Sequence, residues 1–96
     1  MGRLERGYAP DARTPEQAFG IALRAIRRKL GRSQQWLADK SGYHRTYIGL
    51  LEQGHKSPSL RTTFNIATTL QVKPSEIIEE VERLLGHSTK IKARKR

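Results

Sequence analysis

Apolar residues recur along this chain at the three- and four-residue spacing of α-helices, without the alternation that is typical of strands. The clearest run has spacings of four, three and four, which places its members on one helical face: Phe19, Leu23, Ile26 and Leu30. Thr14 is a predicted N-cap, Pro15 suits the first helical position, and Gln17 completes the pattern of a capping box. The first helix is therefore expected to start at Pro15 and to end at Gly31.

Four shorter helices are expected in the rest of the chain. They are separated by glycines and by serine N-caps, and we place them at 34–40, 45–53, 60–70 and from Lys73-Pro74 to Gly86. The inward face of the helix at 60–70 is predicted from its spaced apolar residues, Leu60, Phe64, Ala67 and Leu70. The sequence contains no repeat and no strand pattern, so the predicted fold is all-α with five helices.

The two short helices at 34–40 and 45–53, with Gly42 between them, have the spacing of a helix-turn-helix. A tight turn needs a residue that tolerates positive φ, which glycine does without strain. Ala38 is small where the two helices would cross. In this motif the second helix enters the major groove of DNA, which is about 12 Å wide and just admits an α-helix. The sequence therefore predicts that the helix beginning at Arg45 reads DNA.

Twelve positions around this motif match, at fixed spacing, the pattern of a known family: Ser33, Gln34, Leu37, Ala38, Gly42, Arg45, Ile48, Leu51, Glu52, Gly54, Pro58 and Leu60. Over about residues 17–80 the sequence resembles the Cro/repressor-type (XRE) helix-turn-helix family of transcription regulators. The resemblance implies a five-helix, lambda-repressor-like DNA-binding domain. The run His44-Arg45-Thr46-Tyr47-Ile48, with the following Glu52 and Gly54, also resembles the controller proteins of restriction–modification systems, which are small dimeric regulators.

Several residues depart from the pattern of that family. Arg32 replaces an apolar residue, and Trp36 replaces a residue that is usually polar. We expect the Trp36 side chain to pack locally. The other departures concern helix ends and the predicted reading helix: His44, Gly49, Leu50, Gln71 and Lys73. Because Gly49 and Leu50 lie on the helix that is expected to read DNA, the base-reading code stays open.

Ile48 and Leu51 are expected to point inward, which turns the opposite face of their helix outward: Arg45, Thr46, Gly49 and Leu50. Arg45 is the candidate to bind the O6/N7 edge of a guanine, and Thr46 to contact a neighbouring base or its sugar-phosphate. Leu50 would meet thymine methyl groups, and Gly49 would allow close approach. The alternatives are a phosphate contact or a solvated side chain for Arg45, and partial core packing for Leu50.

Five further residues are candidates for contacts with the DNA backbone: Gln34, His44, Tyr47, Lys56 and Ser57. Gln34 begins its helix, where its side chain and the free backbone N–H groups can bind a phosphate oxygen, and the resemblance implies the same role. Tyr47 flanks the reading face, and Lys56 and Ser57 follow in the next loop. The alternative for each is an ordinary surface residue.

The resemblance also implies an ion pair between Arg27 on the first helix and Glu52 at the end of the predicted reading helix. We expect this pair to be largely buried and hydrogen-bonded. Its role would be to hold the reading helix on the first helix, rather than to read DNA.

The last predicted helix has more apolar residues than one small core requires. Ile77, Val81 and Leu84 suffice for the core, which leaves Ile78 and Leu85 as candidates for a symmetric homodimer interface. A dimer would space two reading helices about 34–36 Å apart, one turn of DNA, and so read a pseudo-palindrome. The alternative is that all five residues pack within one chain.

The charge of the chain favours a polyanionic partner, here double-stranded DNA. The net charge is +10, and residues 14–73 carry ten basic and three acidic residues. The segment 76–83 carries four acidic residues and one arginine, whereas the last ten residues carry five basic residues and no acidic one. We expect a mobile N-terminal arm at 1–13, the DNA-binding domain at 14–86 and a basic tail at 87–96 that adds phosphate contacts or has no role.

Other classes of function find little support in the sequence. The chain has no cysteine, its three histidines are far apart, and it has no nucleophile constellation, so we expect no metal, no cofactor, no small-molecule ligand and no enzyme. No apolar run is long enough for a membrane span, and a cytoplasmic, nucleoid-associated protein is expected. The alternative function is a protein-interaction module of the same fold, such as an antitoxin or a bridging coactivator.

Overall fold

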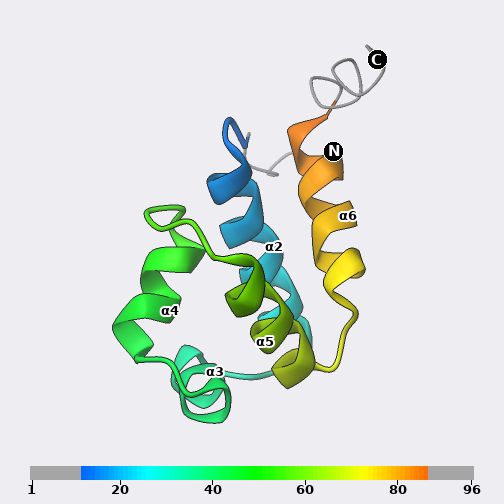
Figure 1. Cartoon of the computed structure of the whole chain (residues 1–96). Helices are drawn as coiled ribbons and strands as arrows, with labels where there is room; N and C mark the ends of the chain where they lie inside the picture. Colours follow the sequence, from blue (N-terminus) through cyan, green and yellow to red (C-terminus); the bar gives the residue numbers. More distant parts are fainter. Residues whose placement is uncertain (1–11, 87–96) are drawn as a thin grey trace.

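The computed structural model describes residues 12–86 and contains five α-helices in that range (Figure 1). They are α2 (Pro15–Lys29), α3 (Gln34–Ser41), α4 (Arg45–Glu52), α5 (Leu60–Leu70) and α6 (Pro74–Leu85). The described part of the chain has no strand, so the all-α, five-helix prediction is confirmed. The basic tail at 87–96 and all but the last two residues of the N-terminal arm at 1–13 lie outside the described residues.

Three helices begin at the hydroxyl side chains that the sequence indicates. Thr14 Oγ1 accepts a hydrogen bond from the Gln17 amide at 3.1 Å, and Ser33 Oγ accepts one from the Trp36 amide at 2.9 Å. Ser59 caps α5 in the same way. The predicted capping box at Thr14 is wrong in one detail, because the Gln17 side chain accepts from the Arg13 amide, one residue earlier than the box requires.

All five helices contribute to one hydrophobic core. Its largest fully buried side chains are Leu23, Leu37, Ile48, Leu51, Ile66, Leu70 and Ile77. α2 packs most extensively against α6, and α3 lies against both α4 and α5. Burial of each leucine or isoleucine contributes about 1.5–3 kcal/mol, so this core is what fixes α3 and α4 relative to the other helices.

The predicted inward face of α5 is partly wrong. Leu60 and Phe64 are 75% and 53% exposed, whereas Ala67 and Leu70 are buried as predicted. The helix is rotated so that Thr62, Thr63 and Ile66 face inward instead. Burial of the two threonines is possible because their hydroxyl groups are hydrogen-bonded, Thr63 donating to the Ser59 carbonyl and Thr62 bonded to neighbouring hydroxyls.

The ends of two helices also differ from the simplest expectation. Leu30, predicted on the inner face of the first helix, is the C-cap of α2 and is 47% exposed. α5 ends at Gln71, which adopts a left-handed conformation with φ of 61° although it is not a glycine. The Gln71 amide donates to the Thr68 carbonyl, so the helix closes despite the unfavourable conformation.

Candidate nucleic-acid interface

The turn between α3 and α4 has the geometry that a helix-turn-helix needs. Gly42 ends α3 with φ of 84°, and its amide donates to the Ala38 carbonyl at 2.9 Å. Ala38 itself is only 1% exposed, and its small side chain lies in the core. His44 then returns the chain to an extended conformation before α4 begins at Arg45.

α4 has an anchored side and an open side. Ile48 and Leu51 are fully buried, while Arg45 and Thr46 are exposed to solvent. Gly49 and Leu50 are half-buried on the same outer part of the helix. The four predicted base-reading residues thus all retain some exposure, although Leu50 and Gly49 less so than Arg45 and Thr46.

Two glycines show how different the surroundings of the two sides are. A β-carbon built at Gly20 of α2 would lie 2.5 Å from the carbonyl oxygens of both Leu51 and Glu52, so α2 and α4 touch backbone to backbone. A β-carbon built at Gly49 would meet only the Gln34 side chain, at 4.0 Å. Space is therefore left open over Gly49.

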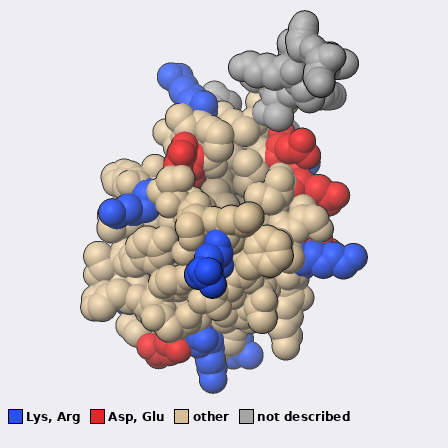
Figure 2. Space-filling model, in the orientation of Figure 1, with Lys and Arg blue, Asp and Glu red and all other residues tan. Residues whose placement is uncertain are grey.

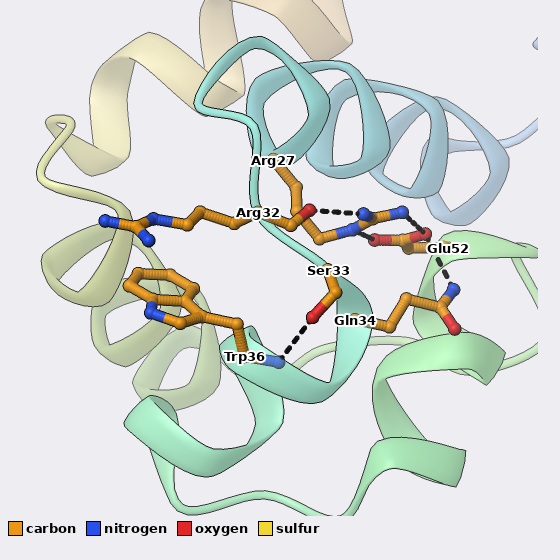
Figure 3. A network of polar contacts seen from close by, with 6 residues as sticks. All are labelled: Arg27, Arg32, Ser33, Gln34, Trp36 and Glu52. Carbon is orange, nitrogen blue, oxygen red and sulfur yellow. Dashed lines mark hydrogen bonds and ion pairs between the residues drawn. The ribbon is translucent and has the colours of Figure 1, made fainter.

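Arg27 and Glu52 form a buried ion pair, shown in Figure 3. Arg27 Nε and Nη2 donate to the two carboxylate oxygens of Glu52 at 2.6 and 3.0 Å, and the two residues are 7% and 8% exposed. Arg27 Nη1 also donates to the Arg32 carbonyl at 2.7 Å. The hydrogen bond to Glu52 raises the pKa of the Arg27 guanidinium, so this residue stays charged.

Gln34 joins this network from the first position of α3. Its Nε2 donates to Glu52 Oε1 at 2.9 Å, which links α2, α3 and α4 through one carboxylate (Figure 3). Sequence reasoning considered Gln34 only for the DNA backbone and missed this bond. The family resemblance was applied to Arg27 and Glu52 alone, and no local pattern joins Gln34 to Glu52, which is 18 positions away.

The other candidates for the DNA backbone lie around the two ends of α4. His44 Nδ1 accepts a hydrogen bond from the Thr46 amide at 3.3 Å, so this histidine caps α4 in place of serine or threonine. Tyr47 is half-buried, with its ring centroid 5.2 Å from that of Tyr43. Lys56 and Ser57 are exposed in the loop that follows α4.

Tyr43 is a residue that sequence reasoning missed. Its hydroxyl donates to Thr62 Oγ1 at 3.0 Å, which ties the turn before α4 to α5. Hydrogen bonds to Asn65 and Thr62 lower the pKa of the Tyr43 phenol. Asn65 also donates to the Ser41 carbonyl at 3.0 Å. An aromatic residue directly after the turn glycine was the available sign that this turn is fastened to another helix.

Two residues that depart from the family pattern meet at the start of α3. The Arg32 guanidinium carbon lies 4.6 Å from the centroid of the Trp36 ring (Figure 3). Trp36 is half-buried and packs against the core, while Arg32 is exposed. The pair spans the N-cap residue Ser33.

α6 carries the acidic side of the described structure. Its acidic residues gather on the side of the molecule where α6 lies (Figure 2). Ile77 and Val81 are buried, Leu84 and Leu85 are half-buried, and Ile78 is 46% exposed. Ile78 also lines a shallow hollow of about 170 Å³ with residues of α2 and of the loop before α5.

Within residues 12–86, no three histidine or acidic side chains come together in a way that could hold a metal ion. None of the five helices combines the length and the apolar character that a membrane crossing demands.

Comparison with known proteins identifies the family. The family model described as helix-turn-helix matches residues 23–77. An HTH-type transcriptional regulator from Archaeoglobus fulgidus is 37% identical over 65 residues, which is 67% of this chain and 93% of that protein. Crystal structures show the same fold. The restriction–modification controller protein C.AhdI from Aeromonas hydrophila is 39% identical, with a TM-score of 0.62 over 64% of this chain and 92% of that one.

A second controller protein, C.Esp1396I, was solved as a tetramer in complex with its natural 35-base-pair operator. It is 24% identical, with a TM-score of 0.68 over 74% of this chain and 93% of that one, and this likeness concerns the fold alone. The family match covers more than half of the chain and agrees with the turn geometry at Gly42. The chain therefore belongs to the helix-turn-helix family of transcription regulators, of the Cro/repressor (XRE) and controller type.

Proposed function

We propose that this protein is a sequence-specific DNA-binding transcription regulator that inserts α4 into the major groove of its operator. The observation that carries the proposal is the two-sided character of α4. Ile48, Leu51 and the Glu52 ion pair anchor one side, while Arg45 and Thr46 stand exposed on the other. A helix held in this way can enter a groove without giving up its own packing.

Arg45 and Thr46 are the proposed base-reading residues, at the start of α4. Arginine suits a guanine because its planar fork can bond O6 and N7 together. The open space over Gly49 supports close approach of the DNA, and Leu50 would contact thymine methyl groups.

Contacts with the phosphates would surround this reading face. Gln34 Nε2 uses one of its two N–H groups for Glu52 and has a second for a phosphate oxygen. Because His44 Nδ1 accepts a bond within the chain, its Nε2 carries the proton and can donate outward. The Tyr47 hydroxyl, Lys56 and Ser57 complete the set.

The protein would act as a symmetric dimer. Ile78 is exposed and Leu85 half-buried along one line of α6, and a second copy would cover them. The acidic side chains of α6 favour an arrangement in which this helix faces away from DNA. Such a regulator would reside with chromosomal DNA in the cytoplasm.

Selection of binding sites from a pool of random duplexes tests the proposal directly. We expect a pseudo-palindromic site whose half-sites are about one helical turn apart. Arg45→Ala should weaken binding to the selected site by about 10- to 100-fold, the effect of one bidentate contact worth about 1–3 kcal/mol, and should relax selection at one base. Enrichment of no sequence, or equal weakening on selected and random DNA, would contradict base reading by Arg45.

A second candidate function is docking to another protein, which the exposure of Leu60 and Phe64 on α5 favours. Replacement of both by serine should leave the affinity for the selected DNA site unchanged. Docking is the main function if two results are found together: the wild-type protein shows no preference among duplexes, and the double variant no longer regulates transcription in the cell.

A further inference from the structure

Arg32 and Trp36 each looked like an isolated departure from the family pattern, yet they form one structural unit. The guanidinium carbon of Arg32 lies over the Trp36 ring, 4.6 Å from its centroid. The two residues are four positions apart, on either side of the N-cap Ser33. We propose that Arg32, held against Trp36, is an additional contact to the DNA backbone at the start of α3. This inference rests on the proposed function, because it requires that α4 occupies the groove.

The position of the pair suits a phosphate. In a helix-turn-helix the first helix, here α3, crosses the DNA backbone while the second enters the groove. Figure 3 shows Arg32 and Trp36 on one side of Ser33 and the Gln34 side chain on the other, turned toward Glu52. A DNA strand that passes the start of α3 would thus meet a donor group on each side of Ser33.

The charge around Arg32 leaves it available for an anion. The first turn of α3 contains no acidic residue. Among residues 12–86 the ion pairs are those of Arg27 with Glu52 and of Arg83 with Glu80, so no carboxylate in this range neutralises Arg32. The Arg32 side chain is exposed, and its backbone carbonyl is already held by Arg27.

Stacking on tryptophan prepares the arginine for this contact. The guanidinium carbon of Arg32 lies 4.6 Å from the centroid of the Trp36 ring, an electrostatic contact that leaves guanidinium N–H groups available for phosphate oxygens. Trp36 is itself fixed by the core, so it restricts the rotamers of Arg32 before DNA arrives. Less side-chain entropy is then lost on binding than for an unrestrained arginine.

The salt dependence of binding to a random-sequence duplex tests the contact without knowledge of the operator. Each phosphate contact contributes about 0.9 to the slope of log affinity against log salt. Arg32→Ala should therefore lower the magnitude of this slope by about one and weaken binding about five- to tenfold near 0.1 M salt. Lys73→Ala is the matched control, since it removes the same charge from the acidic side of the molecule and should leave the slope unchanged.

Two further variants separate the contact from a purely structural role. Trp36→Leu keeps the charge of Arg32 but removes the stacking, and should weaken binding several-fold with little change in slope. Arg32→Lys should restore the slope but only part of the affinity. Thermal melting of every variant checks that the domain is folded, so that a loss of slope is not a loss of structure.

Trp36 is the only tryptophan in the chain, so its fluorescence reports on this site alone. Addition of duplex should change the emission of the wild-type protein, and the change should be smaller in Arg32→Ala. If wild-type protein binds duplex with steep salt dependence while Arg32→Ala and Lys73→Ala share its slope, the contact at Arg32 is refuted and the proposed function stands. If the wild-type protein shows no salt-dependent binding to any duplex, the proposed function fails first and the contact fails with it.

Discussion

Gly20 of α2 lies directly against the backbone of Glu52 at the end of α4, where a β-carbon would come within 2.5 Å of the Glu52 carbonyl oxygen. A flexible side chain could move aside, but a backbone carbonyl at a helix end cannot do so without moving the helix. The position of α4 on the first helix is therefore set by a residue that has no side chain.

Gly20→Ala should consequently destabilise the protein. Alanine is favoured over glycine inside a helix by about 1 kcal/mol, but overpacking against a fixed backbone typically costs about 1–3 kcal/mol and forces α4 to shift. We expect a lower free energy of unfolding in chemical denaturation followed by circular dichroism. Unchanged or increased stability would show that α2 and α4 can separate without cost.

Gly49→Ala is the matched opposite case, because a β-carbon there has open space around it. Its helix preference should raise the free energy of unfolding by up to about 1 kcal/mol. If DNA approaches α4 closely at this point, the same variant should bind the selected site at least tenfold more weakly while it melts at a higher temperature. Affinity equal to that of the wild type would place the DNA surface further from Gly49.

The Arg27–Glu52 pair should behave as a unit. Glu52→Gln leaves the Arg27 charge buried without its partner, and removal of one member of such a pair typically costs about 3–5 kcal/mol. Replacement of both by apolar residues of similar size, Arg27→Met with Glu52→Leu, should recover most of that stability. Arg27→Met, Glu52→Leu and the variant that combines them form a double-mutant cycle, and additive effects would mean that the two residues are not coupled.

Gln71→Gly should stabilise the corner between α5 and α6. Gln71 adopts φ of 61°, a left-handed conformation that costs a residue with a side chain about 1 kcal/mol or more and glycine much less. Glycine also gains freedom in the unfolded chain, which offsets part of the benefit. We expect a small rise in melting temperature, and a fall would indicate that the Gln71 side chain makes a stabilising contact.

Local chemistry explains which parts of the fold were predictable. The caps at Ser33 and Ser59 join a side chain to an amide three residues later, so the sequence contains both partners. The turn at Gly42 is similarly local, because its left-handed φ depends on one residue.

Predictions failed where the answer depends on the arrangement of whole helices. The spacing of Leu60 and Phe64 fits a buried stripe, but α5 is rotated so that Thr62 and Thr63 face inward with their hydroxyl groups bonded. Helical periodicity locates a stripe only to within the width of a face, and polar residues with local partners can take the inner place.

The candidate site shows the same division. The outward position of Arg45 follows from the inward Ile48 and Leu51, since the step per residue in a helix is constant. The bond from Gln34 to Glu52 and the stacking of Arg32 on Trp36 could not be predicted, because the rotamers of long side chains are chosen by their final neighbours.

The two faces of α4 use different residues, and this has a consequence for evolution. Arg45 and Thr46 are not part of the core, so, if they read the operator as proposed, a lineage can acquire a new operator without first compensating for a loss of folding. Under that proposal, a copy of this gene that diverges at those positions would control a different promoter while it keeps the same fold. Families of regulators with one fold and many target sites are the expected outcome when the core residues of such a helix are separate from its exposed residues.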